Sequence, residues 1–199
     1  KTNIENKICK NKKLKCKKLG EVSYRFFPNP RLKIKNLTIN TYFEKNNFIT
    51  VKNTVIKISF RNLLAKEKHQ FKKIKLSNFK SNINIKKLEK YNGIFKDQTS
   101  YLPIRFSNGE ITFYEDENYK KENYIAKIKN TKMSLEFFKD YVNAKLDGEY
   151  LNDKISIKLN KKKINNDLST NIVLKMPKSS LLAKTSFSNL NDKKSIKEG

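Results

Sequence analysis

The residue types that most often carry catalysis are scarce in this chain of 199 residues. His69, the only histidine, lies in a polar run over residues 66–70, which is typical of a solvated loop. The one acidic cluster consists of Glu115, Asp116, Glu117 and Glu122. Because this cluster lacks the alternating ligands and the glycine of a calcium-binding loop, we interpret it as a solvated hairpin tip without metal.

Phosphate chemistry and nucleophilic catalysis also lack their usual motifs. The sequence has no glycine-rich phosphate loop, no nucleophile elbow and no pair of metal-binding histidines. The five glycines, all at expected turns, are Gly20, Gly93, Gly109, Gly148 and Gly199. We therefore expect a protein that is not an enzyme, with no catalytic residue, no metal site and no cofactor.

Two cysteines, Cys9 and Cys16, lie near the beginning of the chain. Their spacing differs from that of a zinc knuckle, and no second cysteine pair accompanies them. They are either two free thiols or a local disulfide in an oxidising compartment, and the sequence does not choose.

Lysine dominates the charge of the chain. The formal net charge is +26, from 45 Lys and Arg residues against 19 Asp and Glu, and only four of the 45 are arginines. Such an excess raises nucleic acid or an anionic membrane as a partner. A nucleic-acid footprint would gather the charges on one face, whereas these lysines are spread almost evenly, so nucleic-acid binding stays an alternative only.

Aromatic side chains close to basic residues add weight to that alternative, because they could stack on bases. They are Tyr24, Phe26, Phe27, Tyr42, Phe43, Phe113 and Tyr114. On alternating strands, however, aromatic residues more often form the core, and we expect these to do so.

Alternation of apolar and polar residues is the dominant pattern along the chain. It occurs in residues 32–34, 74–76, 83–85, 111–113, 144–146, 155–159 and 172–176. Each such segment is typical of a half-buried strand with one wet and one apolar side. The sequence therefore predicts a mostly β fold with many short strands.

Turn residues separate these segments and favour antiparallel neighbours. We expect hairpins near Asn92-Gly93, Asn108-Gly109 and Asp147-Gly148, because these dipeptides readily adopt left-handed turn conformations. Residues 59–66 and 135–141 break the alternation and predict one or two short helical turns. A long antiparallel sheet curled around its apolar face satisfies the pattern as well as a closed sandwich does.

Three stretches, taken in their order along the chain, resemble the amino-terminal region of the AsmA family. Residues 20–39 contain the strand, Pro-containing step and L-x-I-x-N-L-x-I strand of that family. Residues 54–64 followed by 71–79 resemble its strand, leucine turn and I-x-x-I-x-L strand. Residues 103–116 are similar to its N-G-x-I-x-Y-x-D hairpin. The resemblance covers most of residues 20–190.

This resemblance implies an envelope protein of Gram-negative bacteria with a U-shaped β-groove in the periplasm. It further implies an anchor helix in the inner membrane before Lys1 and a role in outer-membrane biogenesis and phospholipid handling. We accordingly take residues 1–199 as one β segment of a longer chain, truncated at both ends.

A single curled sheet would leave one concave apolar face uncovered, where phospholipid acyl chains could bind. The predicted groove residues are Ile56, Ile58, Ile74, Leu76, Ile83, Ile85, Ile111, Phe113, Leu146, Ile155 and Ile157. If a second layer covers these side chains, they are ordinary core and the segment is a structural scaffold.

Overall fold

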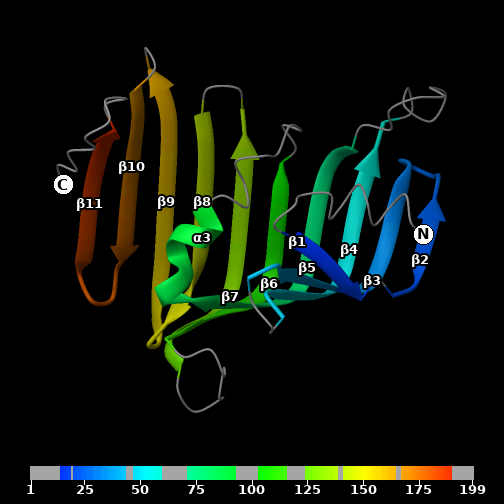
Figure 1. The fold of residues 1–199 in the computed structure, drawn as a ribbon, viewed down its shortest axis with the longest axis horizontal. Helices are drawn as coiled ribbons and strands as arrows, with labels where there is room; N and C mark the ends of the chain where they lie inside the picture. Colours follow the sequence, from blue (N-terminus) through cyan, green and yellow to red (C-terminus); the bar gives the residue numbers. More distant parts are fainter. Residues whose placement is uncertain are drawn as a thin grey trace.

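One curled, open β-sheet makes up almost all of the structure (Figure 1). The computed structural model describes residues 14–18, 20–43, 47–59, 71–92, 103–115, 124–138, 141–164 and 167–189. The strands are β1 (Leu14–Lys18), β2 (Val22–Arg25), β3 (Arg31–Thr41), β4 (Ile49–Ile58), β5 (Phe71–Asn84), β6 (Ile104–Tyr114), β7 (Tyr124–Phe137), β8 (Tyr141–Tyr150), β9 (Asp153–Ile164), β10 (Asp167–Met176) and β11 (Leu181–Asn189). A 3-10 turn, η1 (Ile85–Lys87), and a short helix, α3 (Leu88–Asn92), lie between β5 and β6.

The strands follow one another across the sheet nearly in chain order. The order is β1-β3-β4-β5-β6-β7-β8-β9-β10-β11, and β2 pairs with β3 on the same edge as β1. All neighbours are antiparallel except β5 and β6, which run parallel. The predicted mostly β, curled antiparallel sheet is therefore confirmed, with one parallel pair that the sequence pattern did not reveal.

The parallel pair requires the chain to cross over between β5 and β6. Asn84 begins this connection by accepting a hydrogen bond from the Lys86 backbone N–H at 2.9 Å. The Tyr91 hydroxyl of α3 accepts from the Asn84 backbone N–H at 3.2 Å, and its ring stacks on Phe48 at 5.1 Å. The Tyr91 ring also meets Phe43 edge to face at 5.2 Å, so this buried side chain holds the short helix against the sheet.

Four asparagines in the middle of β3, β5, β6 and β7 interrupt the alternation of these strands. Asn36, Asn78, Asn108 and Asn130 have φ angles of 54°, 55°, 53° and 49°, a left-handed conformation that asparagine adopts more readily than most residues. Three of them take part in hydrogen bonds between neighbouring strands: Asn108 donates to Asn78, and Asn130 donates to Glu149 at 2.8 Å. Strands interrupted in this way bend, so the asparagines form a line along which the sheet curls.

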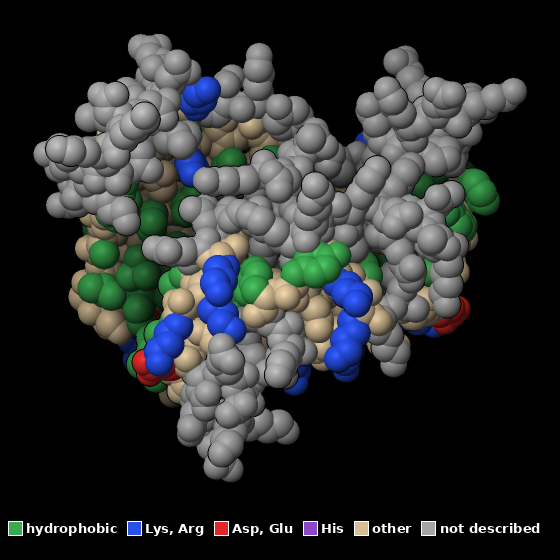
Figure 2. Space-filling model, in the orientation of Figure 1, with side chains coloured by type: hydrophobic (Ala, Val, Ile, Leu, Met, Phe, Trp, Pro, Cys, Tyr) green, Lys and Arg blue, Asp and Glu red, His purple; other side chains and the backbone are tan. Residues whose placement is uncertain are grey.

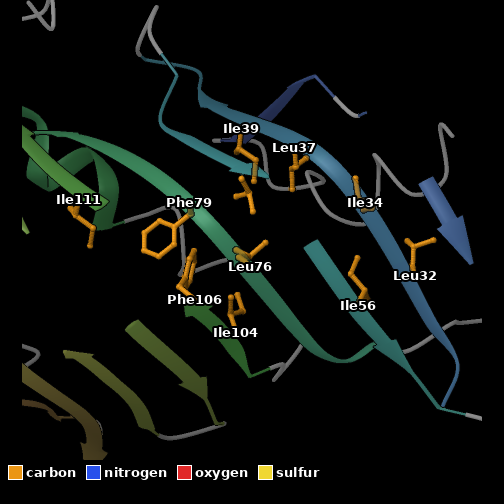
Figure 3. Close-up of a cluster of buried hydrophobic side chains, with 11 residues drawn as sticks. Leu32, Ile34, Leu37, Ile39, Ile56, Leu76, Phe79, Ile104, Phe106 and Ile111 are labelled. Atoms are coloured by element: carbon orange, nitrogen blue, oxygen red, sulfur yellow. The ribbon is translucent and has the colours of Figure 1, made fainter. Parts of the chain in front are cut away.

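The interruption keeps apolar residues on one side of the sheet. In β5, Leu76 and Phe79 flank the bend, are three positions apart instead of two, and are both buried. In β3, Ile34 and Leu37 have the same spacing, and each is 1% exposed. Both halves of a bent strand therefore face the same interior, where their side chains converge (Figure 3).

The two hairpins predicted at Asn108-Gly109 and Asp147-Gly148 are wrong. Both dipeptides lie inside long strands, β6 and β8. A side chain at Gly109 would overlap the ring of Phe79, and one at Gly148 would lie 2.6 Å from the Ile128 side chain and 3.0 Å from the Lys129 carbonyl oxygen. These glycines serve close packing between strands rather than turns. In the third dipeptide, Asn92 ends α3, and Gly93 lies outside the described residues.

The observed turns use other residues. Leu151 and Asn152, with φ angles of 48° and 61°, form the two-residue loop that joins β8 to β9, as in a type I′ hairpin. The helical turn predicted over residues 135–141 is also wrong, because Leu135 and Phe137 pair as strand residues with Ala144 and Val142. The other predicted helical segment is residues 59–66, and all of it except Ser59 lies outside the described residues.

Candidate functional site

Apolar side chains form continuous rows across the carboxyl-terminal half of the sheet. In one row, Met133, Leu146, Ile157, Leu174 and Ala183 lie directly opposite one another from β7 to β11. In the next row, the corresponding residues are Leu135, Ala144, Leu159 and Ile172. Directly opposed side chains on one face are in contact range, so these rows make one apolar surface.

The apolar side chains of the two halves of the sheet differ in exposure. Around β3 to β6 the interior is closed, with Leu32 at 1% and Ile56 at 0% exposure. From β8 to β10 the row residues are only half-buried, as for Leu146, Ile157 and Leu174. Figure 2 shows hydrophobic side chains open to view over the β9 to β11 end of the sheet. The apolar side chains of the described carboxyl-terminal half are therefore less deeply buried than those around β3 to β6.

Within the described residues, the extensive contacts between elements join neighbours in the sheet, apart from the contact of η1 with α3. No second sheet in that part of the chain packs on the half-buried rows. The rows are thus held in place by strand pairing rather than by a covering layer.

The predicted groove residues fall into two clusters that share members. The first cluster contains Ile56, Ile74, Leu76, Ile83 and Ile111, and the second contains Ile155 and Ile157. Phe113 and Leu146 pack against both clusters, which makes the apolar face continuous.

Two predicted residues lie apart from this face. Ile85 belongs to η1 rather than to a strand, and Ile58, which is 9% exposed, lies outside both clusters. The groove list also omitted Leu159, Ile172 and Leu174, although the same alternation marks them in the sequence. That any of these side chains binds lipid stays a prediction.

Polar side chains line two shallow grooves along the bend. The first, of about 420 Å³, crosses β3 to β6 and includes Asn36, Asn78, Asn108, Lys52, Lys80 and Glu110. The second, of about 380 Å³, crosses β7 to β10 and includes Asn130, Lys132, Glu149, Lys154 and Lys175. Both grooves contain lysines and carboxylates, so neither is lined by charges of one sign only.

A buried carboxylate fixes the turn between β10 and β11. Asp153 is 4% exposed and accepts hydrogen bonds from the Lys178 N–H at 3.1 Å and from the Ser179 N–H and hydroxyl at 2.8 Å each. Burial tends to raise its pKa, but the hydrogen bonds from Ser179 and Lys178 outweigh this and hold the pKa of Asp153 below its ordinary value of 3.8. This carboxylate therefore positions β11 beside the apolar rows.

Asp153→Asn is expected to lower the melting temperature by several degrees at neutral pH. A depressed pKa stabilises the fold above the unfolded-state pKa, and this contribution is lost as pH falls through the folded-state pKa. The difference in melting temperature between wild type and Asp153→Asn should therefore be largest at pH 7 and should shrink below about pH 4. Thermal melts across that range measure it, and a gap that is independent of pH would contradict the assignment.

Other sequence interpretations have definite outcomes in the structure. Cys16 is disulfide-bonded, which resolves the two alternatives for this cysteine, while Cys9 lies outside the described residues. Glu115 pairs with Lys86 at 3.3 Å. His69 and the remaining members of the acidic cluster, residues 116, 117 and 122, are not among the described residues.

The expectation that the aromatic residues form the core is only partly right. Phe26 and Phe27 are 63% and 86% exposed, and Tyr24 and Tyr42 are also exposed. Tyr114, by contrast, is 8% exposed, and Phe113 and Phe43 pack against buried clusters. Phe26, Phe27 and Tyr42 lie outside the strands, and Tyr24 lies on the edge strand β2, opposite Leu32 of β3.

In the described part of the chain, no group of three or more His, Cys, Asp or Glu side chains is placed to hold a metal ion. Among the same residues, no helix has the length and apolar character needed to cross a membrane. No protein-family model and no curated protein matches the chain. The resemblance to the AsmA family accordingly stays a prediction.

Proposed function

We propose that this chain is a phospholipid-handling β segment of an AsmA-like envelope protein, which shelters acyl chains on the apolar rows of β8 to β11. The observation that carries the proposal is the half-buried row through Leu146, Ile157 and Leu174 on a sheet with no described second layer. Covering the exposed part of these side chains with an acyl chain would be favourable, by roughly 25 cal/mol per Å² of apolar surface removed from water.

The proposal includes the periplasmic side of the inner membrane as the location, with a membrane anchor before Lys1. A disulfide at Cys16 supports an oxidising compartment, in which such bonds persist. No feature of the described residues suggests catalysis, and the proposed role needs none.

Photo-crosslinking in intact cells tests the proposal. A photoreactive residue at Ile157 or Leu174 of the full-length protein should give phospholipid adducts. The matched controls are Lys158 and Lys175, the exposed neighbours on the other side of the same strands. Equal labelling of both pairs, or no adducts at the apolar pair, would end the proposal. Ile111, at 4% exposure, is too deeply buried to serve as a probe.

A further inference from the structure

The turn between β2 and β3 displays aromatic side chains to solvent. Tyr24, Phe26 and Phe27 are 56%, 63% and 86% exposed. Figure 2 shows hydrophobic side chains at the edge of the molecule where Figure 1 places this turn. The turn is anchored to the sheet, because Pro30 is buried and its carbonyl oxygen accepts a hydrogen bond from the Ile58 N–H at 3.0 Å. The aromatic exposure therefore belongs to an ordered turn.

A row of cations begins at the same turn and crosses four strands. Arg25 lies opposite Arg31, Arg31 opposite Lys57, and Lys57 opposite Lys73. In the adjacent row, Lys75 lies opposite Arg105. We call Arg25, Arg31, Lys57 and Lys73 the cationic row.

Like charges placed directly opposite one another destabilise a sheet. Burial, and then the charges of Arg105, Lys57 and Lys75, lower the pKa of Lys73, against a smaller opposite effect of Glu136. The Arg31 Nε atom is buried and has no hydrogen-bond partner in the structure. No ion pair between described residues involves the cationic row. An external anion would remove this repulsion.

We propose that this end of the sheet docks on the surface of an anionic lipid bilayer. Phe26 and Phe27 enter the headgroup region, and the cationic row contacts lipid phosphates beside them. Aromatic and basic side chains together are the usual composition of membrane-interface contacts. Nucleic acid fits less well, because base stacking needs aromatic side chains beside the row on the sheet face. The adjacent row there contains Lys33, Val55 and Lys75, none of which is aromatic.

This inference rests on residues other than those of the proposed acyl-binding rows, so either can fail alone. The test is co-sedimentation of the purified 199-residue chain with vesicles of phosphatidylglycerol and phosphatidylcholine, compared with vesicles of phosphatidylcholine alone. We expect binding to the anionic vesicles that weakens with salt.

Two variants separate the parts of the contact. Phe26→Ser with Phe27→Ser should weaken vesicle binding about tenfold, from loss of buried apolar area. Arg31→Gln, Lys57→Gln and Lys73→Gln together should weaken it roughly hundredfold, at about fivefold per charge. Leu151→Ser, at the 78% exposed turn between β8 and β9, is the matched control and should bind like wild type.

Folding is checked by thermal melts. Because the triple variant removes opposed like charges, it should melt at or above the wild-type temperature. If the serine variant binds vesicles as tightly as wild type, bilayer docking is wrong. It is also wrong if double-stranded DNA displaces the protein from the vesicles and if DNA binding is lost in the glutamine variant but kept in the serine variant.

Discussion

Gly109→Ala is expected to destabilise the protein by about 2–3 kcal/mol, as for other overpacked cores. A Cβ atom at this position would overlap three atoms of the Phe79 ring. Phe79 is 2% exposed and meets Phe106 edge to face at 5.1 Å, so moving its ring away from a new methyl group would disturb this packing. For a chain of this length, the loss corresponds to a melting temperature about 5–10 °C lower.

A second substitution shows whether the Phe79 contact is the cause. In a Phe79→Leu background, Gly109→Ala should cost clearly less, because the smaller side chain leaves room for the methyl group. Arg105→Lys, at an exposed position of the same strand, is the control for a general effect on β6. A Gly109→Ala protein that melts like wild type would show that the close approach of β5 to β6 is not needed.

One-sided alternation in the sequence was sufficient to predict the class of fold. Segments such as Ile155–Leu159 place apolar residues on one side of a strand, and the structure has them there. Alternation is a pattern within one strand, and it is the same whichever strands lie beside it. It does not report which strands pair, so the parallel alignment of β5 with β6 was not predictable from it.

The alternation did not predict the bend, although asparagines mark its position in the sequence. Ile34-Lys35-Asn36-Leu37, Leu76-Ser77-Asn78-Phe79 and Phe106-Ser107-Asn108-Gly109 share one order: an apolar residue, a polar residue, an asparagine and an inward-facing residue. The same order occurs at Ile128-Lys129-Asn130-Thr131. Each asparagine shifts the alternation by one position. Because strict alternation stops there, the pattern looks like the end of a strand.

The same shift explains the wrong hairpins. Asn108-Gly109 has the composition of a type I′ turn, and Asn108 does adopt the left-handed conformation. What keeps the chain extended is the neighbouring strand: the Phe79 ring occupies the space above Gly109. A contact between residues 30 positions apart cannot be inferred from the dipeptide alone. The accessible part of the apolar face depends in the same way on how far the sheet curls.

The largest functional effect is expected from charges placed in the apolar rows. Ile157 and Leu174 lie directly opposite each other on β9 and β10 and are half-buried. Ile157→Glu with Leu174→Glu would force an acyl chain to share the surface with two carboxylates, and desolvating a charge without a partner costs several kcal/mol. Acyl-chain affinity should fall at least about hundredfold. Lys158→Glu with Lys175→Glu changes exposed neighbours and should leave it unchanged.

Binding of a fluorescent fatty acid to the purified chain, titrated at low and high salt, tests acyl-chain handling most directly. The account predicts saturable binding that salt does not weaken, because burial of apolar surface rather than charge supplies the affinity. It also predicts that binding is lost in the Ile157→Glu, Leu174→Glu variant and kept in the Lys158→Glu, Lys175→Glu variant. Absence of binding to wild type, or binding that falls steeply with salt and disappears with the lysines, would contradict an acyl-binding face on this sheet.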